Sequence, residues 1–285
     1  FPTRRSSDLS QSGIITDESH ADARVVEVRP QRVRDRLEQD EVVIVAGFQG
    51  VSRAREVTTL GRGGSDTTAV VLAAALGAEY CEICSDVDGI WSADPRIVPS
   101  ARAVPEMSLD EAVSLARGGA KVLFEDAVCY ARDHGVDIVA SSTFGPGAGT
   151  RLRTETIGQP RTVAVTGDGR LMVFSLNRDN VAALVDEIRG AGGRIRRRDG
   201  NRIYVDCRNA HGGLSALGGE KAAIVTAVGS SLGEAMEITL KADEALMKAQ
   251  IPVLCCGSSG DDAWWEVKRH QLDLAVRVVH QTLIQ

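Results

Sequence analysis

The fold of this chain is decided by the stretch Thr58-Thr59-Leu60-Gly61-Arg62-Gly63-Gly64-Ser65-Asp66-Thr67-Thr68-Ala69. It follows an apolar pattern typical of a strand (Val42 to Ala46) and opens an apolar pattern typical of a helix (Asp66 to Leu76). The glycines leave backbone N–H groups uncovered, Ser65 is in position to cap the helix, and the helix start adds partial positive charge. This strand, loop and helix therefore predict an anion-binding site.

Arg62 and Asp66 give the predicted anion site both signs of charge. The guanidinium of Arg62 is a rigid fork that binds a carboxylate or phosphate through two hydrogen bonds. Asp66 needs a cation beside it, either an ammonium on the substrate or a nearby lysine. A substrate with both signs of charge fits this loop best. The alternative interpretation, a Gly-rich turn before a surface helix, stays open for a single short motif.

A second loop predicts a nucleotide site. The strand pattern Tyr80 to Ser85 leads into Ser85-Asp86-Val87-Asp88-Gly89-Ile90-Trp91-Ser92-Ala93-Asp94-Pro95-Arg96. Its Asp and Ser side chains can bond ribose or adenine, Trp91 offers a face for a base, and Arg96 can reach a polyphosphate. Farther along, Lys121 follows two glycines and is the predicted phosphate clamp, although alone it would be interpreted as a solvated surface lysine.

In this order and spacing, these runs resemble the aspartokinases of the amino acid kinase superfamily. The resemblance extends from about Gln11 to Leu152 and is carried by the Gly-rich loop together with Val45 to Gly50, Ser85 to Gly89, Ala93 to Arg96 and Gly119 to Leu123. It implies an α/β fold in which helices sandwich a mainly parallel sheet, part of which lies in this chain. It also implies phosphorylation of the β-carboxylate of L-aspartate to 4-phospho-L-aspartate by ATP with Mg²⁺, the first step toward lysine, threonine and methionine.

The same resemblance assigns roles to residues. Lys121 and Asp66 are implied to be catalytic, and no general base is needed because the substrate carboxylate is already ionised at neutral pH. Substrate binding is implied for Arg62, Gly63, Gly64, Ser65 and Asp66. Nucleotide binding is implied for Ser85, Asp86, Trp91, Ser92, Ala93, Asp94, Pro95, Arg96, Lys121 and Val122, and no residue is assigned to a metal.

The sequence also departs from the family. Its members begin with a strand that ends in Lys-[Phe/Tyr]-Gly-Gly, which is not found here, so we expect an N-terminally truncated aspartokinase that is nearly inactive as it stands. Residues 1–9 match nothing in the family and are predicted to be a foreign scar. Trp91 stands where Tyr or Phe is common, and Phe124-Glu125-Asp126 stands where His-Pro often follows the lysine motif.

Strand and helix patterns alternate through residues 10–154, which predicts the C-terminal part of the kinase domain. The expected strands are 25–28, 42–46, 80–85 and 137–141, and the expected helices are 30–39, 66–76, 108–117 and 121–134. Residues 155–161 are predicted to be a linker. Beyond it, two repeated βαββαβ patterns at 162–215 and 216–285 resemble tandem ferredoxin-like ACT domains, with strand 162–166 belonging to the second. The first contains an expected strand at 170–176 and a basic hairpin, 194–198 with 202–207, whose turn signal is Asp199-Gly200-Asn201. The resemblance implies lysine, threonine or both as effectors, and a homodimer formed through these domains.

The composition agrees with a cytoplasmic enzyme. A chain of 285 residues with 43% hydrophobic residues is long enough for two or three domains with ordinary cores. Its net charge of −6 argues against a nucleic-acid partner, and no apolar stretch approaches the roughly 20 residues of a membrane span. Cys81 and Cys84 have C-x-x-C spacing but no second pair, so reduced thiols are expected.

Two other functions stay open from the sequence. One is a different amino acid kinase, for example one acting on glutamate or N-acetylglutamate, which the ACT-like end and the Gly-rich loop argue against. The other is an amino-acid-sensing module whose kinase half is only a scaffold. The missing lysine strand favours this second alternative.

Overall fold

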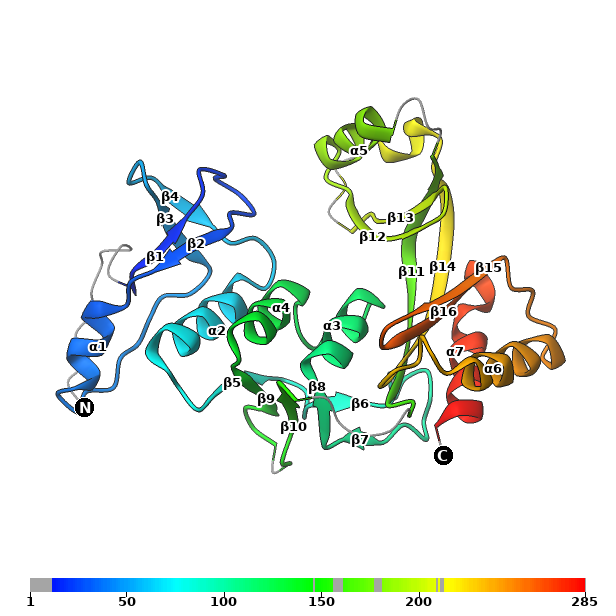
Figure 1. The fold of residues 1–285 in the computed structure, drawn as a ribbon, viewed down its shortest axis with the longest axis horizontal. Helices are drawn as coiled ribbons and strands as arrows, with labels where there is room; N and C mark the ends of the chain where they lie inside the picture. Colours follow the sequence, from blue (N-terminus) through cyan, green and yellow to red (C-terminus); the bar gives the residue numbers. More distant parts are fainter. Residues whose placement is uncertain are drawn as a thin grey trace. The chain divides into compact units, whose positions relative to one another are not determined.

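The computed structural model describes residues 12–284 except 146, 156–160, 177–180, 209 and 211–212. The chain divides into two compact units (Figure 1). Unit 1 comprises residues 1–90, 105–116 and 121–156, and unit 2 comprises residues 91–104, 117–120 and 157–285. The predicted scar at 1–9 lies outside the described residues, as does most of the predicted linker. The domain boundaries expected from the sequence stay predictions.

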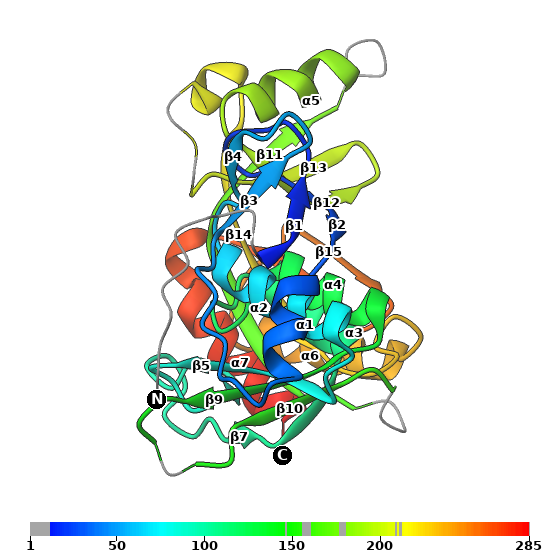
Figure 2. The same cartoon turned by 90° about the vertical axis from the view of Figure 1, so that its left-hand side faces the viewer.

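Unit 1 contains two four-stranded sheets, in the orders β2-β1-β3-β4 and β5-β9-β10-β8. Figure 2 shows the four blue strands of the first sheet side by side. Parallel pairs (β1 with β3, β5 with β9, β10 with β8) alternate with antiparallel ones. The strands are β1 (Ile14–Thr16), β2 (Val25–Val28), β3 (Gln49–Ser52), β4 (Val57–Thr59), β5 (Tyr80–Ser85), β8 (Glu106–Ser108), β9 (Asp137–Ser142) and β10 (Thr150–Arg153).

The helices of this part of the chain are α1 (Gln31–Leu37), α2 (Gly64–Leu76), α3 (Leu109–Arg117) and α4 (Glu125–His134). Helix α2 ends because Gly77 adopts a left-handed conformation (φ 73°), as Gly135 does after α4 (φ 69°). The buried face of α2 places Val71 against Ile14 of β1. Together with the sheets, these helices confirm the expected α/β class.

The expected strand at 42–46 is wrong. Among the described residues this segment pairs with no strand, and Val42 and Ile44 are 77% and 79% exposed. Only Val45 packs against the small core around α2. The alternating apolar pattern is present, but a strand also needs a neighbour for its backbone groups.

Unit 2 is built on one six-stranded antiparallel sheet in the order β12-β13-β11-β14-β16-β15. The two strands expected at 162–166 and 170–176 form a single strand, β11, which pairs along its length with β14. Its register shifts between Asp168 and Leu171. The strands are β11 (Ala164–Ser175), β12 (Arg194–Asp199), β13 (Arg202–Asp206), β14 (Glu220–Val228), β15 (Cys255–Ser259) and β16 (Asp262–Val267); β6 (Ile90–Trp91) and β7 (Ala103–Val104) pair separately.

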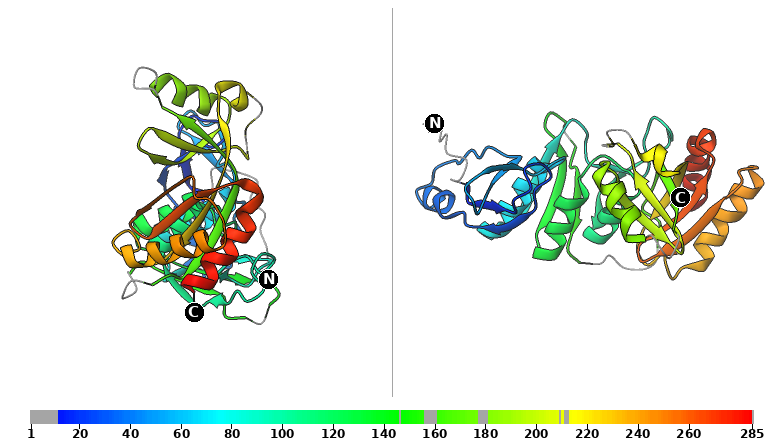
Figure 3. Two further views of the ribbon diagram at one scale, coloured as in Figure 1. Left: turned by 90° about the vertical axis from the view of Figure 1, so that its right-hand side faces the viewer. Right: turned by 90° about the horizontal axis from the view of Figure 1, so that it is seen from above.

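Three α-helices accompany this sheet in the described part of the chain, and a 3-10 turn lies between β13 and β14, where the first βαββαβ pattern has its second helix. Helices α6 and α7 lie next to each other (orange and red in Figure 3) over a core that includes Val225, Trp265 and Val279. No helix in the described part of the chain is long and apolar enough to cross a membrane. The helices are α5 (Val181–Gly190), α6 (Met236–Lys248) and α7 (Leu272–Leu283), with short 3-10 turns η2 (Leu214–Leu217) and η3 (Arg269–Gln271).

The six-stranded sheet curls until its two edge strands approach each other. Cys255 of β15 donates from Sγ to Asp199 Oδ2 of β12 at 3.4 Å, although these strands are at opposite ends of the sheet. Because side chains alternate along a strand, Trp264 lies on the face opposite to Trp265 and the helices. We call this the inner face; its buried apolar residues are Leu171, Val173, Tyr204, Ala222, Ile224 and Trp264.

Buried charges bridge the inner face. Arg197 of β12 pairs with Asp262 of β16 at 2.9 Å. Glu266, whose side chain is 3% exposed, pairs with Arg202 at 2.9 Å and accepts a 2.8 Å hydrogen bond from the Tyr204 hydroxyl. Burial, followed by the Glu266 interaction, raises the pKa of Tyr204. These contacts join strands that the backbone ladder does not bring together.

Candidate functional site

The Gly-rich loop of unit 1 leads directly into α2. Gly63 is the N-cap in a left-handed conformation (φ 70°), and no side chain caps the helix. Ser65 was expected to be the cap and is not, because a capping side chain must precede the first helical residue and α2 begins at Gly64. The Ser65 hydroxyl instead donates to Asp66 Oδ1 at 3.5 Å.

The segment before α4 packs on the Gly-rich loop. A Cβ at Gly63 would overlap the ring of Phe124, so only glycine fits at this approach. Phe124 is the N-cap of α4, which begins at Glu125 rather than at Lys121. Lys121 therefore lies in the loop ahead of the helix, exposed, and Val122 is half-buried beside it. The structure thus brings the expected substrate loop and the segment of the expected phosphate clamp together in unit 1.

Arg62 and Asp66 differ in their surroundings. Arg62 is exposed, and in the described part of the chain it has no ion pair. Asp66 is half-buried; burial raises the pKa of its carboxyl group, and the Ser65 hydrogen bond only partly offsets this. The carboxylate also helps to raise the pKa of the buried Cys81 thiol to about 11, mainly a burial effect. The Asp66 carboxylate is thus partly desolvated, and it has no cationic partner among the described residues. An ammonium group beside it would therefore be stabilised.

The first half of the expected nucleotide loop lies at the carboxyl end of β5. Ser85 pairs with Ser142 in the parallel ladder, and the Thr143 amide donates to the Ser85 carbonyl at 2.9 Å. The Ser85 hydroxyl and the Val87 backbone bond each other, which shapes the turn, while Asp86 is exposed. Carboxyl ends of parallel strands are where open α/β sheets bind ligands.

Sequence reasoning missed two residues at this edge. Asp88 lies against Gly147 of the loop after β9, and its Oδ1 is buried without a hydrogen-bond partner. Phe144 of that loop is 95% exposed and offers an aromatic face. The acidic run Asp-Val-Asp-Gly was a sequence signal for Asp88. No sequence signal placed Phe144 at the same edge of the sheet, because its position there follows from the pairing of β5 with β9.

The second half of the expected nucleotide loop belongs to unit 2. Trp91 is 38% exposed, Pro95 is exposed, and Arg96 forms an ion pair with Asp94 at 2.6 Å. That hydrogen bond raises the pKa of Arg96. Ser92 and Ala93 are buried instead: Ala93 is part of the core under α7, and Ser92 Oγ bonds His280 Nε2 at 2.9 Å. Their side chains therefore support the loop.

His280 makes unit 2 sensitive to acid. Burial, followed by the charge of Arg102, lowers the pKa of this histidine below its ordinary value of about 6.5. The unfolded chain consequently binds a proton more readily than the folded unit, so the free energy of unfolding should fall as the pH drops below about 6.5. In urea titrations between pH 5 and 8, His280→Gln should flatten this loss of stability. The same substitution at the exposed His270 should leave the loss unchanged; equal slopes in all three proteins would contradict the assignment.

Within the described ranges no group of three or more His, Cys, Asp or Glu side chains could hold a metal ion. The features able to hold a ligand in unit 1 are the α2 N-terminus with Arg62 and Asp66, the loop of Lys121, and the edge with Ser85, Asp86 and Asp88. The cationic and acidic side chains of these features have the charges that suit a zwitterion and phosphate groups.

Comparison with known proteins confirms the resemblance to the aspartokinases. Residues 4–139 match the amino acid kinase family. The aspartokinase of Corynebacterium efficiens is 54% identical over 144 residues, which are 50% of this chain and 34% of that protein. The matched region thus spans about a third of the length of this curated relative.

Solved aspartokinases have the same fold. A crystal structure of E. coli aspartokinase III in complex with aspartate and ADP superposes with a TM-score of 0.79 and 25% identity, covering 97% of this chain and 69% of that one. The same enzyme in complex with lysine and aspartate gives a TM-score of 0.74 and 24% identity, covering 97% and 68%. At 24% identity, the superposition with the lysine complex supports a common fold only.

Proposed function

We propose that this chain, which resembles the aspartokinases in sequence and fold, carries part of an aspartate kinase that transfers the γ-phosphoryl group of ATP to the β-carboxylate of L-aspartate. The product would be 4-phospho-L-aspartate, at the start of lysine, threonine and methionine synthesis in the cytoplasm. The proposal draws support from the aspartokinase matches over half of the chain and from the aspartate and ADP bound by the E. coli enzyme.

The observation that carries the proposal is the contrast between Arg62 and Asp66. An exposed, unpaired guanidinium and a desolvated carboxylate stand four residues apart at the start of α2. Arg62 precedes the N-cap Gly63, and Asp66 lies in the first turn of α2. Both side chains therefore belong to the N-terminal end of this helix, where a ligand with both an anionic and an ammonium group would satisfy both. L-Aspartate has these groups, and its second carboxylate is the nucleophile.

Ligand stabilisation tests this pairing of charges. L-Aspartate should raise the melting temperature of the chain more than succinate, which has the two carboxylates but lacks the ammonium group. Asp66→Asn should remove the difference between the two ligands. Asp273→Asn, the same change in the first turn of α7, serves as the control. If Asp66→Asn still distinguishes aspartate from succinate, Asp66 does not bind the ammonium.

Nucleotide binding is proposed separately for the residues of unit 1 and for those of unit 2. In unit 1, Ser85 and Asp86 would bond the nucleotide from the carboxyl end of β5, and Lys121 with Val122 would contact its phosphates. In unit 2, Trp91, Asp94, Pro95 and Arg96 are the accessible side chains, while Ser92 and Ala93 would act through the backbone. Mg²⁺ would accompany ATP through its phosphate oxygens.

Phosphoryl transfer can be measured directly. The segment of the C. efficiens relative that precedes the matched region would be joined ahead of Gln11, and ADP release followed with aspartate, glutamate or N-acetylglutamate. Release that depends on aspartate alone supports the proposal. Release that depends on glutamate would favour another amino acid kinase, and binding of both aspartate and ATP without any release would favour a sensing module.

Arg62→Lys should raise the KM for aspartate well above any change in the KM for ATP. A lysine ammonium is a point charge and cannot replace the two parallel hydrogen bonds of the guanidinium. The two KM values would be obtained from initial rates of ADP release with each substrate varied in turn. Equal effects on both substrates would show that Arg62 does not act on aspartate.

Regulation is proposed for unit 2. Its two βαββαβ patterns have the ferredoxin-like order expected of ACT domains, and the E. coli aspartokinase III structure holds lysine. We therefore propose lysine, threonine or both as effectors and a homodimer formed through this unit. Sedimentation of the chain with and without each amino acid would test both statements.

A further inference from the structure

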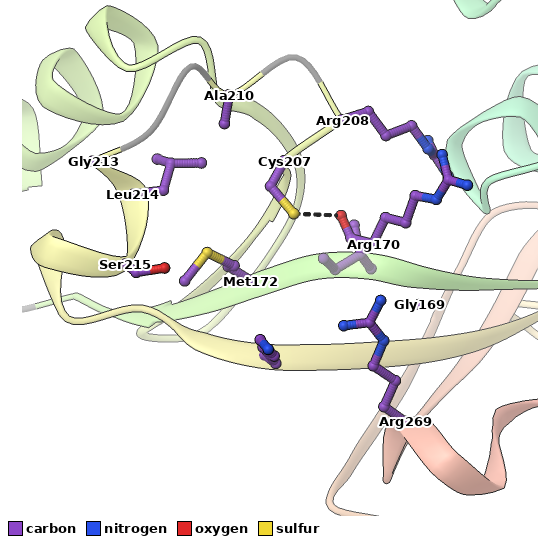
Figure 4. Close-up of a pocket in the computed structure, with 12 residues that line it drawn as sticks. Gly169, Arg170, Met172, Cys207, Arg208, Ala210, Gly213, Leu214, Ser215 and Arg269 are labelled. Carbon is purple, nitrogen blue, oxygen red and sulfur yellow. Dashed lines mark hydrogen bonds between the residues drawn. The ribbon is translucent and has the colours of Figure 1, made fainter.

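Unit 2 contains a cavity of about 320 Å³ where the register of β11 shifts. Its wall is completed by Cys207, Arg208 and Ala210 after β13, and by residues of the 3-10 turn η2, the start of β14 and the turn η3 (Figure 4). The volume is at the lower end of the range for small-molecule sites. The lining residues are Gly169, Arg170, Leu171, Met172, Cys207, Arg208, Ala210, Gly213, Leu214, Ser215, Lys221 and Arg269.

The cavity wall is cationic. Arg170, Arg208, Lys221 and Arg269 line it, and none of the lining residues is acidic. Arg208 is neutralised by Asp168 at 2.8 Å and by Asp206 at 2.9 Å, although its buried Nε has no hydrogen-bond partner. In the described part of the chain, the other three cations take part in no ion pair. The wall therefore carries excess positive charge.

The cationic side chains are placed around Gly169 of β11, which has no side chain of its own. Figure 4 shows the Arg269 guanidinium turned toward Gly169 from one side of the strand, whereas the side chains of Arg170 and Arg208 extend on its other side. A Cβ at Gly169 would lie 3.8 Å from Arg269 Cγ and Nε, which places the arginine over that part of β11. Burial, followed by the charge of Asp206, raises the pKa of the Cys207 thiol, and the charge of Arg269 acts weakly in the opposite direction. The cations thus approach the cavity from β11, β14 and η3.

The remaining lining is apolar. Met172 and Leu214 are 7% and 3% exposed and belong to one hydrophobic cluster beside the cavity. An apolar floor below a cationic rim suits an organic anion rather than a hydrated inorganic ion alone. An ammonium group would meet cations without an acidic partner, which disfavours zwitterionic amino acids.

We propose that this cavity binds a small organic anion with at least two negative charges and no cationic group, a polycarboxylate or a phosphate ester. Arg170, Arg269 and Lys221 would hold its charged groups, since guanidinium groups bind carboxylate and phosphate through paired hydrogen bonds. Met172 and Leu214 would contact its carbon skeleton. Such a ligand would belong to a different class of metabolite from the amino acid effectors proposed for this unit.

Isothermal titration of the whole chain tests the proposal, with citrate (a polycarboxylate) and fructose 1,6-bisphosphate (a phosphate ester) as the probes and L-lysine and matched NaCl as comparisons. The double variant Arg170→Gln/Arg269→Gln should weaken binding by roughly tenfold or more, from the loss of two charge-assisted contacts. The charge-matched control is Arg189→Gln/Arg198→Gln, which alters two exposed arginines that do not line the cavity. Unliganded melting temperatures would verify that both variants fold.

Cys207 gives a second readout in the unaltered chain. Its thiol lies in the wall, bonded to the Arg170 carbonyl at 3.0 Å, so a bound anion should slow its alkylation by iodoacetamide relative to the exposed Cys84. If only citrate shows variant-dependent binding, the cavity is a polycarboxylate site. If only fructose 1,6-bisphosphate does, it is a phosphate-ester site, and if both do, it accepts either class of organic anion. Equal binding by both double variants, or no protection of Cys207, would overturn the proposal.

Discussion

In the chain joined to the N-terminal segment of the C. efficiens relative, Lys121→Met should lower the kcat of aspartate phosphorylation by roughly two to three orders of magnitude, as expected for the loss of one preorganised charge at the transferring group. Lys121 is exposed in the loop before α4, and nothing in the described part of the chain pairs with it. Its ammonium is therefore available to offset the charge that develops on the phosphoryl oxygens. Initial rates of ADP release at saturating aspartate and ATP would measure the effect.

A surface lysine provides the control. Lys241 forms an exposed pair with Glu237 on α6, and Lys241→Met should leave kcat unchanged. The melting temperature of Lys121→Met should match that of the parent protein, because the side chain makes no packing contact that would be lost. A turnover number within about threefold of the parent, a difference below ~1 kcal/mol, would show that Lys121 is an ordinary surface residue.

Glu266→Ala should lower the free energy of unfolding of unit 2 by about 3–5 kcal/mol, the usual cost of removing one partner from a buried ion pair. The change leaves the guanidinium of Arg202 and the buried hydroxyl of Tyr204 without their acceptor. Urea unfolding followed by tryptophan fluorescence is suited to this measurement, because Trp264 and Trp265 adjoin Glu266 on β16.

Two further variants separate burial from charge. Glu244→Ala removes a carboxylate whose pair with Lys248 is 3.7 Å long and exposed, and it should leave the unfolding midpoint unchanged. Glu266→Gln keeps an acceptor for Tyr204 and should fall between the parent and Glu266→Ala. If Glu266→Ala costs less than ~1 kcal/mol, solvent reaches the inner face and the curled sheet opens in solution.

Much of the local structure could be predicted from the sequence. The strand pattern at 80–85 is β5, the helix expected at 66–76 differs from α2 only at its first residues, and the basic hairpin around Asp199 and Gly200 is β12 and β13. In these segments the period of the apolar residues and the glycine or turn signals agree, so neighbours in the sequence suffice. The motif residues that carried the resemblance were likewise local, and the aspartokinase matches confirm it.

Tertiary structure decided what depends on a partner far along the chain. The segment 42–46 has the alternation of a strand but lacks a neighbour, whereas β11 joins two predicted strands because β14 pairs along both. Asp88 meets Gly147 only because β5 pairs with β9. The sequence by itself thus determined most of the local elements, the Gly-rich loop and its charges. Strand pairing decided the edge at Asp88, the inner face and the cationic cavity, because backbone hydrogen bonds and burial select partners that no local pattern specifies.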